Sequence, residues 1–466
     1  MAEWPAKCGR AEVSSRAIAV YDASDAFHSN KEYVMSEIPN WLSADAISRR
    51  DAIVGLARGA SVAALGSSFV AQAVAAATGS DTYAPDSALV PFRVSVPQSR
   101  IDDLKRRLAA TRWPDRETVS DWSQGVPLGS AKRLVAYWHD RYDWRKFERK
   151  INAYPQFRTH IDGLGIHFIH VKSRHVNALP IILTHGWPGS VVEFLKVIGP
   201  LTDPTAHGGS ADDAFHVVIP SQPGFGWSDK PAETGWNVVR TAKAWGVLMA
   251  RLGYKRWVAQ GGDWGSGVTH ALGHIRPDGL VAAHVNWPLV IPAKPSENLS
   301  PEEKSALEAA GKFLSDGFGY FAEQATRPQT VGYALEDSAV GQATWIYEKF
   351  QAWTDNKGRV EDVLSFEEML DDISVYWFTD SATSSARIYW ENTRQGGGFD
   401  AGKIDLPMAA TIFPKEIYRA PKSWAQERWP NLIYWNEVDR GGHFAAFEQP
   451  QLFAEEMRKA FRSVRT

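Results

Sequence analysis

Residues 259–267 read Ala-Gln-Gly-Gly-Asp-Trp-Gly-Ser-Gly, and they join two patterns that predict different secondary structures. The apolar run at 256–259 is typical of a short β-strand, and residues 268–275 fit a helix. A tight strand-to-helix turn needs small neighbours, because its central residue is strained and its backbone crowds the helix. The glycines around the centre supply them, so Asp263 is predicted at the tip of the turn, at the carboxyl edge of a sheet.

A carboxylate at this tip suits one kind of chemistry. Backbone N–H groups at the start of a helix favour negative charge, so we expect Asp263 to be ionised and accessible. An aspartate in this position forms an ester by attacking carbon directly, which suits an epoxide or an alkyl halide. Aspartate is also a common helix N-cap, and the turn alone leaves that second interpretation open.

The rest of the chain predicts an α/β domain divided by a helical insertion. Short apolar runs of β-rich composition alternate with helical patterns, which favours a parallel sheet covered by helices. These runs lie at 180–183, 216–219, 256–259, 409–413 and 432–435. Between about 291 and 400 the strand signal is replaced by helical, aromatic sequence, with 366–378 the clearest helix. A last helix is expected from 450 to about 462.

Residues 90–178 predict an accessory region before the core. Apolar spacing indicates a helix near 101–108 and a second one over 130–147. Two β-rich runs, 157–161 and 166–171, flank an Asp-Gly turn and predict a hairpin. The hairpin carries His160, His167 and His170 at metal-like spacing, but no carboxylate cluster accompanies them, so we expect surface positions and no metal site.

These patterns divide the chain into six segments. They are 1–47 (without regular structure, or an over-long start), 48–80 (a signal segment), 90–178 (the accessory region), 179–290 (first part of the core), 291–400 (the helical cap) and 401–466 (second part of the core). Met35 is an alternative initiator, and it would give the signal segment a short leader.

The signal segment contains Arg49-Arg50, a mildly apolar run and several Ala-x-Ala sites, which resemble a twin-arginine export signal. We therefore expect export to the periplasm or secretion, with a cytoplasmic location as the alternative. A short Ala-rich helix without targeting value is the other interpretation of this segment. Arg58 and the small residues disfavour a permanent membrane span.

Composition excludes several classes of protein. The 466 residues carry a formal charge of −3, which disfavours a nucleic-acid partner. Forty-four per cent of the residues are apolar, so a large core can form without disulfides. The one cysteine, Cys8, cannot build a disulfide framework, a thiolate metal cluster or a redox pair within the chain.

Two further motifs accompany the turn. His443 lies in a glycine-flanked loop beyond the last predicted strand, and the order nucleophile, acid, histidine is typical of α/β-hydrolases. Glu416 follows the strand at 409–413 and is the favoured acid, with Asp439 and Asp405 as alternatives.

The loop His185-Gly-Trp-Pro-Gly-Ser190 follows the first core strand. We expect it to offer the Trp187 N–H, which together with the Trp264 N–H would form an oxyanion hole. An ordinary strand-end loop is the alternative interpretation. A cis bond before Pro188 would fix this turn.

Taken together, these motifs resemble the α/β-hydrolase-fold epoxide hydrolases of the microsomal and juvenile-hormone type. The resemblance rests on residues 185–190, 262–265 and 440–448, and on 111–115 and 154–157 for the family's N-terminal domain. It covers the chain from about residue 90 to the end. The eukaryotic relatives carry a membrane anchor before this point. The arginine-pair segment departs from that pattern, so membrane association is not carried over.

The resemblance implies a site and a reaction. Tyr320 and Tyr389 match the two cap tyrosines that hold the epoxide oxygen, although from the residues alone both could be core aromatics and Tyr376 competes with them. Glu416 matches the acid. The implied reaction converts an apolar epoxide and water to a diol through an ester on Asp263. It requires no metal or organic cofactor.

Other functions remain open at this point. A haloalkane dehalogenase shares the nucleophile and fold, and Asn286, Trp287 and Trp264 could bind halide. A non-catalytic binding protein on the same fold is a second alternative. A serine esterase is disfavoured because Ser266 lies past the tip of the turn. A homodimer is also open.

Overall fold

The computed structural model describes residues 87–292, 296–394 and 402–465, all of which belong to one compact unit, Leu56–Thr466. The predictions for 1–47 and 48–80, including Cys8, Met35 and the signal segment, lie outside the described residues. In the described ranges, no helix is long and apolar enough to span a bilayer.

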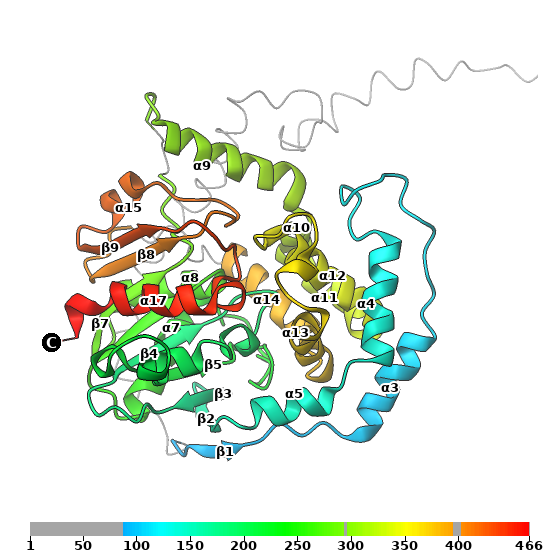
Figure 1. The fold of residues 1–466 in the computed structure, drawn as a ribbon, viewed down its shortest axis with the longest axis horizontal. Coiled ribbons are helices and arrows are strands. Elements are labelled where there is room, and N and C mark those ends of the chain that lie inside the picture. Colours follow the sequence, from blue (N-terminus) through cyan, green and yellow to red (C-terminus); the bar gives the residue numbers. More distant parts are fainter. Residues whose placement is uncertain (1–86, 293–295, 395–401, 466) are drawn as a thin grey trace, which may run out of the picture. The chain divides into compact units, whose positions relative to one another are not determined.

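A nine-stranded sheet forms the centre, in the order β1-β2-β3-β5-β4-β6-β7-β8-β9 (Figure 1). Its strands are β1 (Val90–Phe92), β2 (Gln156–Ile161), β3 (Leu164–Val171), β4 (Leu179–Thr184), β5 (Phe215–Pro220), β6 (Trp257–Gly261), β7 (Leu280–Val285), β8 (Met408–Ile412) and β9 (Leu432–Glu437). Strands β5, β4, β6, β7, β8 and β9 run parallel to one another. Strands β1, β2 and β3 extend the sheet beyond β5 with antiparallel pairing. The predicted parallel sheet is confirmed. β1 and β7 were not predicted.

The helices frame this sheet. In the described part of the chain they are α3 (Gln98–Ala109), α4 (Leu128–Asp140), α5 (Trp144–Ile151), α6 (Ile198–Thr202), α7 (Val238–Arg251), α8 (Trp264–Ile275), α9 (Pro301–Lys312), α10 (Gly319–Thr326), α11 (Pro328–Asp337), α12 (Ala339–Trp353), α13 (Phe366–Phe378), α14 (Ala382–Arg394), α15 (Lys422–Arg428), α16 (Ala445–Glu448) and α17 (Pro450–Ala460). α8 packs on β4, β6 and β7, and α17 packs on β8 and β9, in front of the sheet in Figure 1. Helices α9 to α14 lie between β7 and β8 in the chain, which confirms the helical insertion.

The single helix predicted over 130–147 is wrong, because the chain forms two helices there. α4 ends at Asp140, and α5 begins at Trp144. The Asp143 carboxylate accepts the Arg145 N–H at 2.9 Å and so caps α5. Both helices bury a tryptophan, Trp138 and Trp144, so the apolar spacing continues across the break and hides it in the sequence.

The predicted hairpin is confirmed, with both turn residues, Asp162 and Gly163, at positive φ. The expected surface positions hold only for His160, which is exposed; those of His167 and His170 are wrong, because β3 is an interior strand between β2 and β5 and both side chains are buried. Burial lowers the pKa of His167 to about 3 and that of His170 to about 4.

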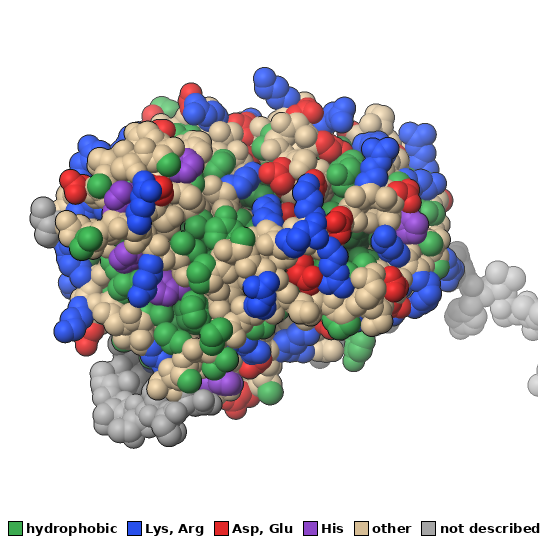
Figure 2. Space-filling model, turned by 60° about the horizontal axis from the view of Figure 1, so that its bottom comes forward, with side chains coloured by type: hydrophobic (Ala, Val, Ile, Leu, Met, Phe, Trp, Pro, Cys, Tyr) green, Lys and Arg blue, Asp and Glu red, His purple; other side chains and the backbone are tan. Residues whose placement is uncertain are grey.

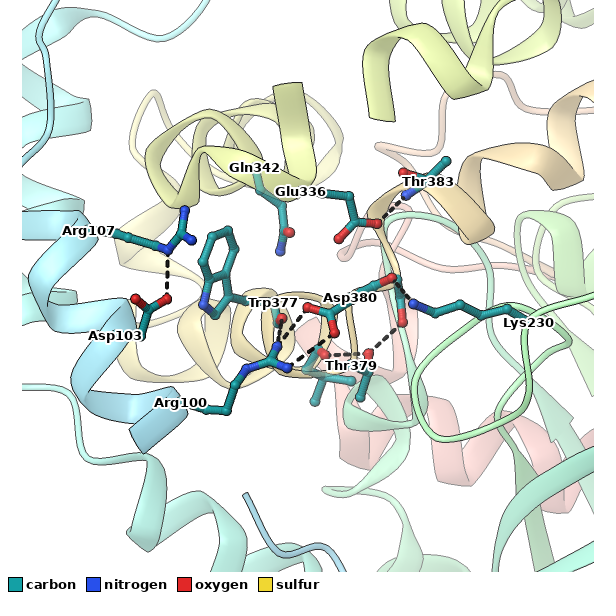
Figure 3. Close-up of polar contacts among 12 residues, drawn as sticks. Arg100, Asp103, Arg107, Lys230, Glu336, Gln342, Trp377, Thr379, Asp380 and Thr383 are labelled. Carbon is teal, nitrogen blue, oxygen red and sulfur yellow. Dashed lines mark hydrogen bonds and ion pairs between the residues drawn. The ribbon is translucent and has the colours of Figure 1, made fainter. Parts of the chain in front are cut away.

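The accessory helices contact the cap directly. α3, α4 and α5 pack against α12 and α13, and they lie beside these helices in Figure 1. Figure 3 shows the turn between α13 and α14, where the Arg100 guanidinium pairs with the Asp380 carboxylate at 2.7 Å. Lys230, from the core, donates to the Asp380 carbonyl. The turn that leads into α14 is therefore held from both the accessory region and the core.

Neither sign of charge dominates the face that Figure 2 shows. Basic and acidic side chains are interspersed there among polar and hydrophobic ones. This pattern fits the nearly balanced totals of 51 basic and 54 acidic residues.

Candidate active site

Asp263 occupies the tip of the turn between β6 and α8. Its backbone has φ 50° and ψ −128°, a strained conformation for a residue with a side chain. The small neighbours are required: a Cβ on Gly265 would collide with the Thr184 carbonyl, and one on Gly261 would collide with Gly265. The helix begins at Trp264, directly after the tip, so Asp263 stands at its positive end.

The carboxylate of Asp263 lies against the loop that follows β4. The Trp187 N–H donates to Asp263 Oδ1 at 2.9 Å. Gly186 makes this approach possible, because a Cβ there would collide with the Asp263 carboxyl group. The Trp187–Pro188 bond is cis, as expected. The loop therefore holds one oxygen of the carboxylate and leaves the other toward His443.

His443 links two carboxylates. Its Nε2 lies 3.2 Å from Asp263 Oδ2, and its Nδ1 lies 2.5 Å from Glu416 Oε1. The same oxygen of Glu416 accepts the Ile417 N–H at 2.8 Å, which orients the carboxyl group. Asp405 and Asp439 are exposed, so of the three acids considered only Glu416 contacts the imidazole in the described structure.

The charge on His443 is set by these neighbours. Burial opposes the protonated imidazole, but the charges of Glu416 and Asp263 and the hydrogen bonds to them outweigh that effect. The pKa of His443 is therefore raised well above its ordinary value. The two carboxylates therefore favour the protonated form of the imidazole.

Tyr320 on α10 and Tyr389 on α14 cover the turn from the cap. The Tyr320 ring stacks on Trp187 with centroids 5.1 Å apart, and the Tyr389 ring stands edge-on to Trp264 at 4.9 Å. Burial first, and then the charge of Asp263 among other neighbours, raises the pKa of both phenols well above the ordinary value. The Tyr389 hydroxyl is buried and has no hydrogen-bond partner among the described residues.

Tyr376, the competing tyrosine, is hydrogen-bonded to the backbone. Its hydroxyl donates to the Gly189 carbonyl at 2.8 Å, and its side chain is buried. Ser266 is likewise held by the backbone, because its Oγ donates to the Trp287 carbonyl at 2.8 Å. Neither hydroxyl is therefore available to a substrate in this arrangement.

The structure adds residues that sequence reasoning missed. The Trp353 ring stands edge-on to His443 at 5.0 Å, and so does the ring of Trp287 at 5.8 Å, a residue that the sequence had indicated only as a candidate for halide binding. The Lys349 ammonium lies 4.4 Å above the Tyr320 ring. Glu193 lies in a small pocket with Asp263 and His443. Glu193 lies eight residues after His185, the first residue of the loop motif at 185–190. This closeness in sequence was the one indication that Glu193 could lie at the site.

The described residues contain no group of three or more His, Cys, Asp or Glu side chains that could hold a metal ion. The assembled groups can supply a nucleophile, an imidazole, two phenols and a backbone N–H. Together they suit a displacement at carbon followed by hydrolysis of the product ester.

Comparison with known proteins gives two matching family models. Residues 89–194 match the model "Epoxide hydrolase N terminus", and residues 180–454 match "alpha/beta hydrolase fold". A candidate epoxide hydrolase of Stigmatella aurantiaca is 65% identical over 81% of this chain and 86% of its own length. Epoxide hydrolase 1 of Sus scrofa is 37% identical over 81% of this chain and 89% of its own length.

Solved structures agree with this. The juvenile hormone epoxide hydrolase of the silkworm Bombyx mori has a TM-score of 0.75 at 30% identity, over 82% of this chain and 96% of that one. The epoxide hydrolase of Aspergillus niger has a TM-score of 0.72 at 32% identity, over 81% and 97%. The chain belongs to the epoxide hydrolases of the α/β-hydrolase fold.

Proposed function

We propose that this enzyme converts an apolar epoxide to a vicinal diol in two steps, through an alkyl ester on Asp263. The observation that carries the proposal is the placement of one carboxylate between a backbone N–H, an imidazole and two phenols. Asp263 contacts Trp187 and His443 directly, and Tyr320 and Tyr389 pack on its neighbouring tryptophans.

In the first step, Asp263 attacks an epoxide carbon and the ring C–O bond breaks. The electron pair stays on the ring oxygen, which takes a proton from Tyr320 or Tyr389. Both phenols lie in an apolar, buried setting that disfavours a lasting phenolate. The imidazolium of His443 can return a proton to the tyrosine, which leaves a neutral imidazole for the second step.

In the second step, His443 acts as the base toward water. Ester formation neutralises Asp263, which is one of the charges that raise the pKa of His443. The first step therefore lowers the pKa of the imidazole at the stage when it must accept a proton. Water attacks Cγ of Asp263, one water proton passes to His443, and the other leaves with the diol. The resting imidazolium and carboxylate are restored.

The oxygen that bears charge in this second step is already held. Trp187 N–H donates to Asp263 Oδ1 in the resting site, and the same contact can stabilise the oxyanion of the tetrahedral intermediate. The Trp264 N–H, at the start of α8, is the second proposed donor.

The ring-lined surroundings favour a bulky apolar epoxide. Trp187, Trp264, Trp353 and Phe321 pack about the two tyrosines.

The test is diol formation from a styrene-oxide-like epoxide, with the Asp263→Ala variant as the control. We expect diol from the wild type and none above background from the variant. Full activity in Asp263→Ala would refute the nucleophile. Halide release from a haloalkane, with no diol from epoxides, would instead identify a dehalogenase.

A further inference from the structure

A small pocket lies beside Asp263, and the two cap tyrosines do not line it. Its polar walls include Asp263, His443 and Glu193, and its remaining walls include Phe194, Phe444, Ala445, Ala446 and Phe453. The pocket leaves about 10 Å³ for the centre of a water molecule, which is the scale at which a cavity holds one water. It therefore reaches the nucleophile and the base from a side other than that of the phenols.

The loop after β4 places Glu193 in the wall of this pocket. It lies in the short 3₁₀ helix Val191–Phe194, which the Ser190 hydroxyl caps by accepting the Val192 N–H at 3.2 Å. The Glu193 carboxyl group lies directly against Gly189, where a Cβ would collide with it. Two glycines of one loop thus make room for two carboxyl groups, Gly186 for Asp263 and Gly189 for Glu193.

The carboxyl group of Glu193 shares the pocket with the Asp263 carboxylate and the His443 imidazole, which lie 3.2 Å from each other. Burial, and then the charges of Asp372 and Asp263, raise its pKa well above the ordinary value, although His443 and a backbone hydrogen bond from Gly186 act in the opposite direction. A carboxyl group offers an acceptor oxygen in either protonation state. A side chain so placed can hold a water without itself exchanging a proton.

We propose that Glu193 is a positioning residue for the water that hydrolyses the Asp263 ester. The water donates one hydrogen bond to Glu193 and the other to Nε2 of His443, and this leaves a lone pair directed at Cγ of Asp263. The water oxygen bonds to Cγ, the proton facing His443 moves to Nε2, and the C–O bond to the diol breaks. The proton facing Glu193 leaves with the diol oxygen, so Glu193 ends in the state in which it began.

This inference rests on the proposed two-step function and predicts a defect in the second step alone. Rapid mixing with excess enzyme, followed by acid quench and mass measurement of the protein, gives the rates of ester formation and ester loss separately. For Glu193→Leu, which fills the same space without an acceptor, we expect ester formation within about twofold of wild type. Ester loss should slow at least about tenfold, because the water is no longer held.

The variant Glu193→Gln keeps an acceptor oxygen and should restore ester loss to within about fivefold of wild type. Asp371→Asn is the matched control. Asp371 is also a buried carboxylate, with Tyr142 donating to it at 3.1 Å, but it does not line the pocket, so both rates should stay near wild type. Thermal unfolding of each variant identifies loss of fold, and Glu193→Ala serves in place of Glu193→Leu if the latter is unstable.

The outcomes separate this inference from the function on which it depends. Unchanged ester loss in Glu193→Leu, or an equal slowing of both steps, overturns the role of Glu193 and leaves the ester mechanism standing. Absence of an ester in the wild type, with diol still formed, overturns the mechanism itself. Accumulated ester in Glu193→Leu together with rescue by Glu193→Gln supports the proposal.

Discussion

The two sides of the site are held in different ways. On the core side, Asp263, His443 and Glu416 are joined at 2.5 and 3.2 Å, and each follows a strand of the parallel sheet. On the cap side, Tyr320 and Tyr389 are fixed by ring contacts, and the Tyr389 hydroxyl has no hydrogen-bond partner in the described structure. The core side is therefore held by charge and by the His443–Glu416 hydrogen bond, whereas the cap side is held by ring packing.

This difference follows from what each side must do. Charged groups that exchange protons need fixed mutual geometry, which hydrogen bonds at strand ends provide. A phenol that must bind a substrate oxygen is best held by its ring, because a hydrogen bond inside the protein would compete with the substrate. Substitutions on the core side should therefore stop one defined step of the reaction. Substitutions on the cap side should lower the rate of ester formation by degrees.

The largest losses of activity are expected for substitutions of Asp263 and His443, which we call the core pair. Asp263→Ala and His443→Gln should each lower turnover on the order of 10⁴-fold or more, since residues that act as a unit lose most of their effect together. They should differ in one respect: His443→Gln should form the ester and stall, and Asp263→Ala should form none. Intact-protein mass after mixing with epoxide measures this. Equal behaviour of the two variants would break the distinction between nucleophile and base.

Glu416→Gln should follow, with a loss on the order of 10³-fold, because the imidazole loses both its orienting partner and a charge that raises its pKa. Rapid quench should place the loss in ester hydrolysis. Asp439→Asn, an exposed alternative acid, is the matched control and should stay near wild type. A large loss in that control with an active Glu416→Gln would reverse the assignment of the acid.

The cap tyrosines should show the graded response. Tyr320→Phe and Tyr389→Phe should each slow ester formation about 10²-fold, because one phenol remains to protonate the ring oxygen. The double variant should lose substantially more. Tyr376→Phe controls for loss of a buried phenol that hydrogen-bonds the backbone, and it should leave the alkylation rate near wild type. Single variants as inactive as the double variant would contradict a shared role.

The core pair should also make stability depend on pH. The folded-state pKa of His443 is raised, so its contribution is fully present below the unfolded value of about 6.5 and is lost as pH rises through the folded value. The free energy of unfolding of the wild type should therefore fall over that range by up to about 1.4 kcal/mol per pH unit. Denaturant titrations of wild type and His443→Gln across this range measure it. An identical slope in both would remove His443 as the cause.

The smallest effect is expected at the turn in Figure 3. The Arg100–Asp380 pair is well exposed, with side-chain exposures of 42% and 53%, so Arg100→Gln should cost about 0.2–1 kcal/mol of stability. Because this turn leads into α14, the ester-formation rate should fall more than ester loss, although by less than about threefold. Chemical denaturation and rapid quench provide both values. A selective loss in ester hydrolysis would contradict the division between the two sides.

Local patterns in the sequence were enough for the turn at Asp263, the hairpin, five core strands and the helix α13, since each has a sequence period of its own. The sequence did not predict β7, the break at Asp143 or the burial of His167, because these depend on neighbours distant in the chain. Tyr320 and Tyr389 came from a family resemblance, since their spacing is no different from that of core aromatics. Glu193 was not predicted, because its place near the nucleophile depends on the contact of its carboxyl group with Gly189 and on the pocket that it shares with Asp263.

The central claim is that the carboxylate of Asp263 attacks the substrate. A single turnover of a styrene-oxide-like epoxide in heavy-oxygen water, followed by digestion and mass measurement of the peptide that contains Asp263, tests this directly. We expect heavy oxygen in Asp263 and none in the diol of the first turnover, because water enters at Cγ of the ester. Heavy oxygen in the diol and none in Asp263 would mean direct attack by water, and would contradict it.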